Sequence, residues 1–331
     1  MYENRTVVCV TPAGRRRYMR LLAPYVLSSR LVDRWDLWVN TTARGDLAFF
    51  RALARREPRV RLVEHPSGAT ASPEAIGAFT RFAMEPRTVY VRFDDDVVWV
   101  EPGFFEAFLA FRVAHPEPFL VAPLILNNAL CSNVLQTFRK ILASRPISTA
   151  CLDKVGWRDP DFALQLHRFV LDLIRKGEID RLHCGTVPIA HNRFSINCIS
   201  WTGEDMARSG GVQGIEEEEE LSAVLPARMR RGNCFFTDVA VAHYSFYSQR
   251  EVVEASDVLT EYAAVLAGRA ELAEWRSRVE EAVVEADAQD DGGDWAWPPR
   301  RRLGWDLRRR WRTWRRRSKA PRVTLTAGPD L

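Results

Sequence analysis

The sequence predicts an α/β domain in which a central, mostly parallel sheet is flanked by helices. Short apolar runs rich in Val, Phe and Trp alternate with segments of helical periodicity through the first half of the chain. Such alternation is typical of a parallel sheet buried between helices. From about residue 251 Leu, Ala, Val and Glu dominate, which predicts a C-terminal helical extension. A chain of 331 residues suits one large domain with appendages, or two small domains.

The predicted strands are short runs of β-branched and aromatic residues. Five of them lie in the first half of the chain, at Thr6–Val10, Trp35–Asn40, Val60–Val63, Val89–Phe93 and Phe119–Val121. Another strand is expected at Cys234–Val241, directly before His243. The carboxyl ends of parallel strands meet at one edge of a sheet, and ligands of such folds bind there.

The predicted helices lie between these strands, at residues 15–28, 47–55, 73–84 and 101–114. Ser72 and Pro73 suit the start of the third one, as its N-cap and first helical residue. A later helix is indicated by apolar residues at helical spacing, namely Leu166, Phe169, Val170, Leu173 and Ile174, and Gly177 follows as a stop signal. Residues 255–287 are also expected to be helical.

We expect three segments along the chain: the α/β domain at 1–250, the helical extension at 251–290, and a linker with a basic tail at 291–331. Residues 300–319 hold eleven Arg or Lys and one Asp. The net charge of the whole chain is +4, so the remainder carries a net charge of −6. The last dozen residues are expected to be disordered.

Composition excludes several classes of protein. No run approaches the roughly 20 apolar residues of a membrane-spanning helix. The six cysteines form no CxxC pair, which argues against a zinc ribbon or a redox motif. No signal-peptide pattern precedes the first strand. We therefore expect a cytoplasmic protein with reduced thiols.

The strongest chemical signal is Asp94-Asp95-Asp96, which interrupts an apolar run at the end of a predicted strand. Adjacent carboxylates repel one another, and a divalent cation offsets the cost of burying them. Alternate residues of an extended segment face the same side, so Asp94 and Asp96 would address one site while Asp95 points elsewhere. Oxygen ligands suit Mg²⁺ or Mn²⁺, which bind phosphate groups. The competing interpretation is a turn capped by solvated carboxylates.

A strand that ends in an Asp-x-Asp motif, about ninety residues into an α/β domain, resembles the nucleotide-sugar glycosyltransferases of the GT-A fold. The run from Tyr90 to Asp96 is similar to the version found in a bacterial group of these enzymes. Three more stretches support the resemblance, which covers about residues 5–250: Thr11–Arg15, Arg193–Asn197 and His243–Arg250. The resemblance implies a Rossmann-like domain with a mixed, mostly parallel sheet.

The resemblance also implies a metal site for Mn²⁺ or Mg²⁺ against the diphosphate of a nucleotide-sugar donor. Asp96 is the first choice as ligand, and Asp94 is a metal or ribose contact. Asp95 belongs to the donor-binding set. His243 stands where a late histidine of the family completes the metal shell, although a core or strand-end histidine fits the sequence equally well.

In inverting members of this family a carboxylate deprotonates the acceptor hydroxyl. The acidic run 216–220 precedes Leu221, and Glu218 or Glu219 would be that base. A solvated start of a helix, where the helix dipole favours acidic residues, is an equally supported interpretation.

Donor binding is also expected in the loop after the first strand, at Thr11, Pro12, Ala13 and Arg15. A strand–loop–helix turn presents backbone N–H groups to phosphate, and Arg15 would neutralise the diphosphate. Asp46 is the nearest candidate for the acidic residue that contacts the nucleotide base in this family. However, Asn40-Thr41-Thr42 occupies the strand end where that residue is expected.

Acceptor-binding residues are sought among Phe194, Asn197 and Trp201, because aromatic rings stack on sugar faces and Asn197 is polar in an apolar setting. For both aromatic residues ordinary core packing is the competing interpretation. The acceptor class that we expect is a glycan or a lipid-linked glycan.

The segment 300–319 interleaves arginine with Trp305, Trp311 and Trp314. This pattern favours an interfacial helix on an anionic membrane at the cytoplasmic face. Nucleic-acid binding, and a tail paired with the acidic stretch 280–294, are the alternatives.

Taken as a whole, the sequence favours metal-dependent glycosyl transfer, with inversion, in polysaccharide biosynthesis. A metal-dependent nucleotidyltransferase would also use clustered carboxylates. The third possibility is a non-catalytic protein that binds nucleotides or nucleic acid.

Overall fold

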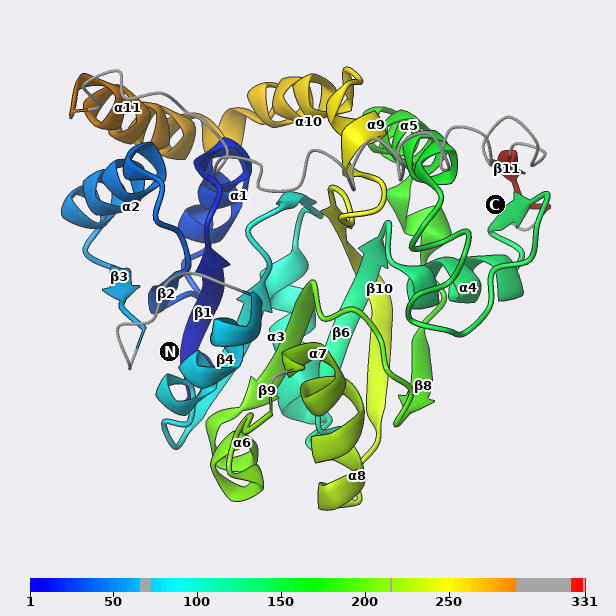
Figure 1. Ribbon diagram of the computed structural model, residues 1–331, viewed down its shortest axis with the longest axis horizontal. Helices are drawn as coiled ribbons and strands as arrows, with labels where there is room; N and C mark the ends of the chain where they lie inside the picture. Colours follow the sequence, from blue (N-terminus) through cyan, green and yellow to red (C-terminus); the bar gives the residue numbers. More distant parts are fainter. Residues whose placement is uncertain (66–72, 215, 290–322, 330) are drawn as a thin grey trace, which may run out of the picture.

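A computed structural model describes the protein except for residues 66–72, 215, 290–322 and 330. Figure 1 shows a central twisted sheet with helices on both of its faces. The strands are β1 (Thr6–Ala13), β2 (Arg34–Val39), β3 (Val60–Val63), β4 (Thr88–Phe93), β5 (Val97–Val100), β6 (Val121–Leu126), β7 (Ile141–Ala143), β8 (Thr186–Ala190), β9 (Cys198–Thr202), β10 (Asn233–His243) and β11 (Leu325–Ala327).

The helices alternate with these strands. The α-helices are α1 (Arg16–Ser28), α2 (Arg44–Arg56), α3 (Phe104–Ala114), α4 (Ala129–Thr137), α5 (Pro160–Lys176), α6 (Gly203–Ser209), α7 (Glu217–Glu219), α8 (Leu225–Met229), α9 (Arg250–Glu254), α10 (Val258–Ala267) and α11 (Ala273–Gln289). The 3₁₀ helices are η1 (Pro73–Phe82), η2 (Ile179–Leu182) and η4 (Ala270–Leu272), and η3 (Glu220–Val224) is a π-helical turn.

The strand order confirms the expected fold class. The main sheet runs β3-β2-β1-β4-β9-β6-β10-β5, and β8 pairs with the other half of β10. Strands β1 to β4 are parallel, as are β6 and β10, whereas β9 runs antiparallel between β4 and β6. The carboxyl ends of β1, β4, β6 and β10 therefore meet at one edge of the sheet, together with the start of β9.

Strand β1 is longer than predicted, because Thr11, Pro12 and Ala13 continue it instead of forming a loop. These residues pair with β2, while the pairing of β1 with β4 ends at Val10. Pro12 thus lies where one side of the strand is free, which is the position that a strand tolerates for proline. The loop before α1 consists only of Gly14 and Arg15.

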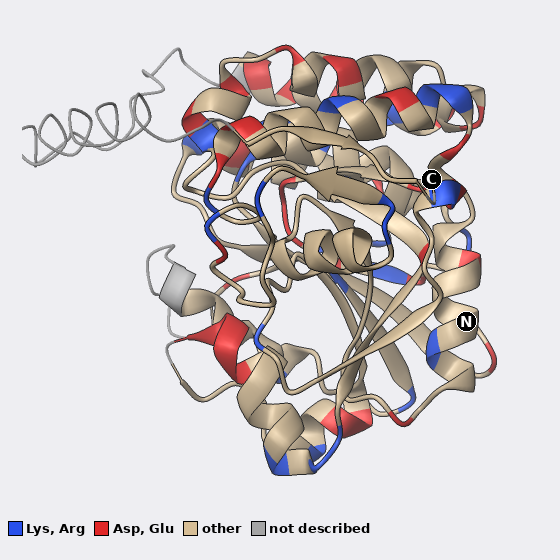
Figure 2. Ribbon diagram, turned by 90° about the vertical axis from the view of Figure 1, so that its right-hand side faces the viewer, with Lys and Arg blue, Asp and Glu red and all other residues tan. Residues whose placement is uncertain are grey.

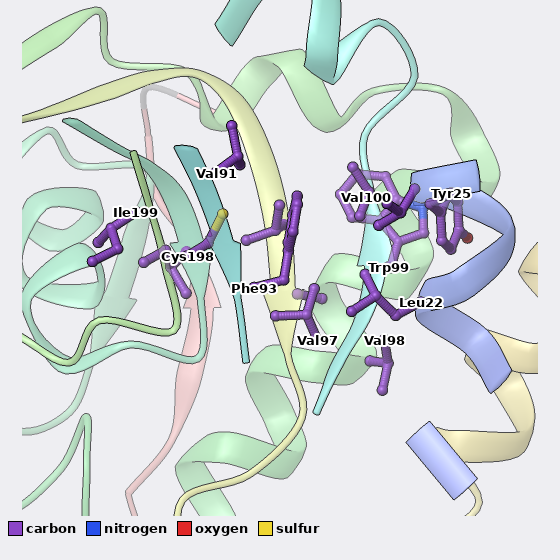
Figure 3. Packing of buried hydrophobic residues seen from close by; sticks show 14 of the residues in the cluster. Leu22, Tyr25, Val91, Phe93, Val97, Val98, Trp99, Val100, Cys198 and Ile199 are labelled. Carbon is purple, nitrogen blue, oxygen red and sulfur yellow. The ribbon is translucent and has the colours of Figure 1, made fainter. Parts of the chain in front are cut away.

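Strand β5 was not predicted. Its side chains are fully buried between α1 and β10, and Figure 3 shows Trp99 and Val100 beside Leu22 and Tyr25 of α1. The apolar run after the aspartate triplet is therefore a second strand that turns back from β4. The helix predicted at 101–114 begins three residues later than expected, because α3 starts at Phe104.

The C-terminal extension packs on the main domain. Helix α11 lies beside α1 and α2 (Figure 1) and buries Val279, Ala282, Val283 and Ala286. Ion pairs join Arg55 and Arg56 to Glu285. Figure 2 shows acidic and basic residues interspersed over the helices at the top of the view. The predicted single helix at 255–287 is divided into α10 and α11 by a turn at Gly268.

The end of the chain differs from the prediction of disorder over the last dozen residues. Strand β11 pairs antiparallel with β7. Gln165 of α5 holds this segment, because its side chain donates to the Val323 carbonyl (2.8 Å) and accepts from the Leu325 N–H (3.0 Å). The predicted basic tail at 300–319 lies outside the described residues. In the part of the chain that the structure describes, no helix is both long and apolar enough to cross a bilayer.

Candidate functional site

Polar side chains from five strand ends meet at the carboxyl edge of the sheet. This follows from the strand directions, because four parallel strands end there and β9 begins there. The residues are Arg15 after β1, Asp94 to Asp96 after β4, Asn127 after β6, Asn197 before β9 and His243 at the end of β10. The fold thus brings three of the predicted metal-binding and donor-binding elements to one edge of the sheet, namely the aspartate triplet, Arg15 and His243.

The aspartate triplet forms the turn between β4 and β5 and does not continue β4. The Val97 N–H donates to the Asp94 carbonyl (3.1 Å) and closes this turn. A turn lacks the alternation of an extended strand, so the expected sharing of one site by Asp94 and Asp96 does not hold. Arg15 instead binds Asp95 and Asp96 together, and Asp94 has other partners.

Asp96 has more cationic or protonatable neighbours than the other carboxylates of the triplet, and its side chain is 3% exposed. Its Oδ2 atom lies 2.9 Å from Arg15 Nη2 and 3.7 Å from Arg250 Nη2. His243 Nε2 lies 3.5 Å from the other carboxylate oxygen. Burial opposes ionisation, but Arg15, His243 and Arg250 outweigh it and lower the pKa of Asp96.

His243 is held in one orientation by the backbone. Its Nδ1 atom lies 3.1 Å from the Asn127 carbonyl oxygen, which can only accept, so Nδ1 carries a proton. Nε2 then faces Asp96 as a lone pair or as a second N–H. Burial alone would lower the pKa of His243, but Asp96 raises it. A proton or a metal ion between Nε2 and the carboxylate would satisfy both groups.

Asp94 belongs to a second network, which includes two residues that the sequence analysis missed. Arg92 Nη2 donates to Asp94 Oδ1 (3.0 Å), and Asn197 Nδ2 donates to Asp94 Oδ2 (3.1 Å). Arg92 Nη1 lies 2.7 Å from Glu217 Oε1, close but not aligned for a hydrogen bond, so this contact is an ion pair. Burial raises the pKa of Glu217, which Arg92 opposes. A charged residue inside an apolar strand was the available signal for Arg92.

The two predicted candidates for the general base lie on α7, near the same network. Glu218 Oε1 accepts from Arg193 Nε (3.0 Å) and from the Cys151 thiol (3.2 Å). Burial raises the pKa of Cys151 to about 12, so the thiol stays protonated and donates. Glu219 is more exposed, with half of its side chain in solvent, and contacts Arg193 at 3.2 Å. Glu218 is therefore the more firmly oriented of the two.

The other predicted donor residues serve structural contacts. Thr11 is buried in β1 and accepts a hydrogen bond from Trp35 Nε1 (3.1 Å). Pro12 and Ala13 are buried in the same strand. Asp46 is buried at the start of α2 and accepts from the Arg16 N–H (2.9 Å), so it joins the starts of α1 and α2.

Two of the three predicted acceptor residues lie in the core. Phe194 is fully buried and packs edge-on against Phe235. Trp201 is fully buried, stacks on Tyr90 and donates to the Ala83 carbonyl (3.0 Å). Because β9 is antiparallel to β4, Trp201 lies away from the carboxyl edge. Only Asn197 reaches the edge.

The residues present fit a divalent cation in part. In residues 1–65, 73–214, 216–289, 323–329 and 331 no group of three His, Cys, Asp or Glu side chains could hold a metal ion. The predicted set of Asp94, Asp96 and His243 is therefore not assembled. Asp96 and His243 alone form an oxygen–nitrogen donor pair with an oriented imidazole, and diphosphate oxygens would complete such a shell.

No family model and no curated protein matches this chain. Among solved structures it is similar to a mycobacterial protein, with 14% identity, a TM-score of 0.43 and coverage of 79% of this chain and 73% of that one. It is also similar to glucosyl-3-phosphoglycerate synthase from Mycobacterium tuberculosis in complex with Mn²⁺, uridine diphosphate and phosphoglyceric acid. The sequence identity is 12% and the TM-score 0.42, and the match covers 79% of this chain and 78% of that one. A third similar structure is 4-diphosphocytidyl-2C-methyl-D-erythritol synthase from Anaerococcus prevotii DSM 20548. Its sequence identity is 10% and its TM-score 0.40, and the match covers 80% of this chain and 99% of that one.

Proposed function

We propose that the protein is a divalent-metal-dependent glycosyltransferase that moves a sugar from a nucleotide-diphosphate sugar to a hydroxyl acceptor. The observation that carries the proposal is the buried pair of Asp96 and His243, flanked by Arg15 and Arg250, at the carboxyl edge of the sheet. One carboxylate among three cationic or protonatable side chains suits a site for a metal and a diphosphate.

The two arginines supply the electrostatic part of this chemistry. A departing nucleoside diphosphate gains negative charge, and fixed cations stabilise it. Asp96 and His243 would hold Mn²⁺ or Mg²⁺, which neutralises charge on the diphosphate when it is bound. Arg15 and Arg250 both lie within 4 Å of the Asp96 carboxylate, so either guanidinium is near enough to contact a diphosphate bound beside Asp96.

Glu218 is our proposed general base, which makes the reaction inverting. Arg193 and the Cys151 thiol fix its carboxylate, while about a quarter of its side chain remains exposed. A base must be both oriented and accessible to the acceptor hydroxyl. Substitution of Glu218 by Gln should abolish turnover and leave nucleotide binding intact. Loss of nucleotide binding in Glu218→Gln would assign this residue to donor binding instead.

The acceptor that we propose is a glycan or a lipid-linked glycan. The basic segment 300–319 would bring the enzyme to the cytoplasmic face of an anionic membrane. Replacing its arginines by glutamine should then abolish sedimentation with phosphatidylglycerol vesicles. Unchanged sedimentation would remove the membrane from the proposal and leave the transfer reaction untouched.

Calorimetric titration of UDP, GDP and dTDP, with and without Mn²⁺, tests the donor site. One nucleotide should bind in a metal-dependent manner to the unmodified protein and lose that binding in Asp96→Asn. Asp172→Asn is the matched control and should bind normally, because Asp172 lies on the surface and pairs with Lys176. Absence of binding for all three nucleotides would contradict the proposal. Release of pyrophosphate from nucleoside triphosphate and sugar phosphate would favour a nucleotidyltransferase.

A further inference from the structure

The guanidinium group of Arg15 lies between the two buried carboxylates of the triplet. Its Nε atom donates to both Asp95 oxygens (3.1 Å each), and Nη2 contacts Asp95 and lies 2.9 Å from Asp96 Oδ2. The side chains of Asp95 and Asp96 are only 8% and 3% exposed. Two adjacent buried carboxylates repel strongly unless a cation lies between them. Arg15 is that cation.

Arg15 is the solvent-accessible member of this cluster. Its side chain is 30% exposed, much more than the carboxylates that it binds. It is the second residue of the two-residue loop between β1 and α1 and is not part of either element. The ring of Tyr18 lies 5.1 Å from its guanidinium carbon. This cation–π contact is made in the same position as the carboxylate contacts, and it does not depend on the charge of either carboxylate.

The remaining partners of the carboxylates do not depend on Arg15. Asp95 keeps a hydrogen bond from the Gly14 N–H (3.0 Å). Asp96 keeps His243 and Arg250. The turn is further fixed by the Tyr244 N–H, which donates to the Asp96 carbonyl (2.9 Å). The geometry of the carboxylates therefore survives a movement of Arg15.

We infer that Arg15 is an exchangeable internal cation: it holds Asp95 and Asp96 while no metal is bound, and it moves to the donor diphosphate when a divalent ion takes Asp96. The inference rests on the proposed function and adds a role for Arg15 as a coupling residue. A metal ion alone must displace Arg15 without offering it a new anion. A metal ion with a nucleoside diphosphate offers that anion, so each ligand should strengthen the binding of the other.

Substitution of Arg15 separates these two effects. In Arg15→Met the carboxylates lose their internal cation, so Mn²⁺ alone should bind at least about fivefold more tightly than to the unmodified protein, within the usual range of coupling between sites. UDP, GDP or dTDP, whichever binds with Mn²⁺, should bind more weakly, because its diphosphate loses a cation. The mutual strengthening of metal and nucleotide binding should shrink.

The experiment measures free Mn²⁺ by electron paramagnetic resonance during titration of the full chain, with and without each of the three nucleotides. Arg15→Lys keeps the positive charge and should retain the weak metal binding of the unmodified protein. Arg16→Met is the neighbouring control, because Arg16 pairs with Asp287 instead of the triplet, and should change nothing. Circular dichroism checks that each variant is folded.

Two outcomes would overturn the inference and spare the proposed function. One is equal or weaker binding of Mn²⁺ alone to Arg15→Met than to the unmodified protein. The other is a metal affinity of Arg15→Lys that rises as much as that of Arg15→Met. Absence of Mn²⁺ binding in every variant, with and without nucleotide, would instead contradict the metal-dependent function itself.

Discussion

Asp94, Asp95 and Asp96 are chemically identical and consecutive, yet each has different surroundings. Asp94 is the most exposed and binds Arg92 and Asn197. Asp95 and Asp96 share Arg15, and only Asp96 also faces His243 and Arg250. The reason is the turn that they form, which directs neighbouring side chains to different elements. Asp96 is therefore the carboxylate with the most cationic neighbours.

Substitution of Glu217 by Gln should destabilise the protein by about 3 kcal/mol, because the buried Arg92 then loses one of the two carboxylates, Glu217 and Asp94, with which it pairs. Glu216→Gln, in the same acidic run, should be nearly neutral, since the Glu216 side chain is 69% exposed. Urea unfolding of both variants measures the difference. Equal stability of the two variants would show that the Arg92 ion pair contributes nothing.

The sequence predicts some of these residues and not others for a physical reason. Asp96 could be found because carboxylates interrupt an apolar run, and His243 because it ends a predicted strand. The pairing of Arg92 with Glu217 could not, because Arg92 on β4 and Glu217 on α7 are far apart in the sequence and meet only in the folded chain. Local patterns identify unusual residues, but they do not identify partners across the sheet.

At the scale of single elements, close packing sets limits that composition does not reveal. Helix α6 begins at Gly203, where an added Cβ atom would lie 1.9 Å from the Glu85 carbonyl oxygen. Gly203→Ala should therefore destabilise the protein by about 3 kcal/mol, since the backbone of one segment must move. Gly268→Ala is the control, because its nearest contact would be an ordinary 3.5 Å. Thermal unfolding compares them, and a Tm of Gly203→Ala equal to that of the control would contradict this packing.

Helix α5 carries a buried histidine whose neutral form fits its surroundings. His167 Nε2 lies 2.7 Å from the Tyr244 carbonyl oxygen, and Nδ1 lies 3.0 Å from the Tyr262 hydroxyl. The carbonyl requires Nε2–H, which leaves Nδ1 to accept from the tyrosine. Burial lowers the pKa of His167 to about 4.

This pKa predicts a loss of stability in acid. The unfolded chain takes up a proton near pH 6.5 and the folded one only near pH 4, so His167 contributes stability above pH 6.5 that is lost as the pH falls. At pH 5 the loss should be about 2 kcal/mol. Urea unfolding at pH 7.5 and pH 5 measures it. The variant His167→Gln cannot titrate at this position, so it should lose less stability than the unmodified protein between pH 7.5 and pH 5. An equal loss of stability in both proteins would rule out His167 as its source.

At the scale of the whole molecule, the helical extension is part of the folded body. Helix α11 covers α1 and α2 and joins them through Arg16, Arg55 and Arg56. Helix α1 in turn covers β5 and follows Arg15, so the extension supports the helix that begins at the candidate site.

A chain that ends at Leu272 should therefore be less stable, by at least about 3 kcal/mol, than a chain that ends at Gln289. The buried side chains of α11 include two valines, and each contributes about 1.5 kcal/mol or more. Comparing the two chains isolates α11, because both lack β11. Urea unfolding and soluble yield are the measurements, and equal values for both chains would show that α11 is dispensable.

The sequence by itself determined the class of fold, the strands β1 to β4 and β10, and the residues that interrupt apolar runs. These features depend on local periodicity and on the cost of burying charge, both of which act within a short stretch of chain. The tertiary structure decided that Asp94 separates from Asp96, that Arg15 joins Asp95 to Asp96, and that Phe194 and Trp201 belong to the core. Those outcomes depend on strand order, on the antiparallel β9 and on the turn before β5. They arise because distant segments must share one buried sheet, and only the folded chain fixes which side chains then meet.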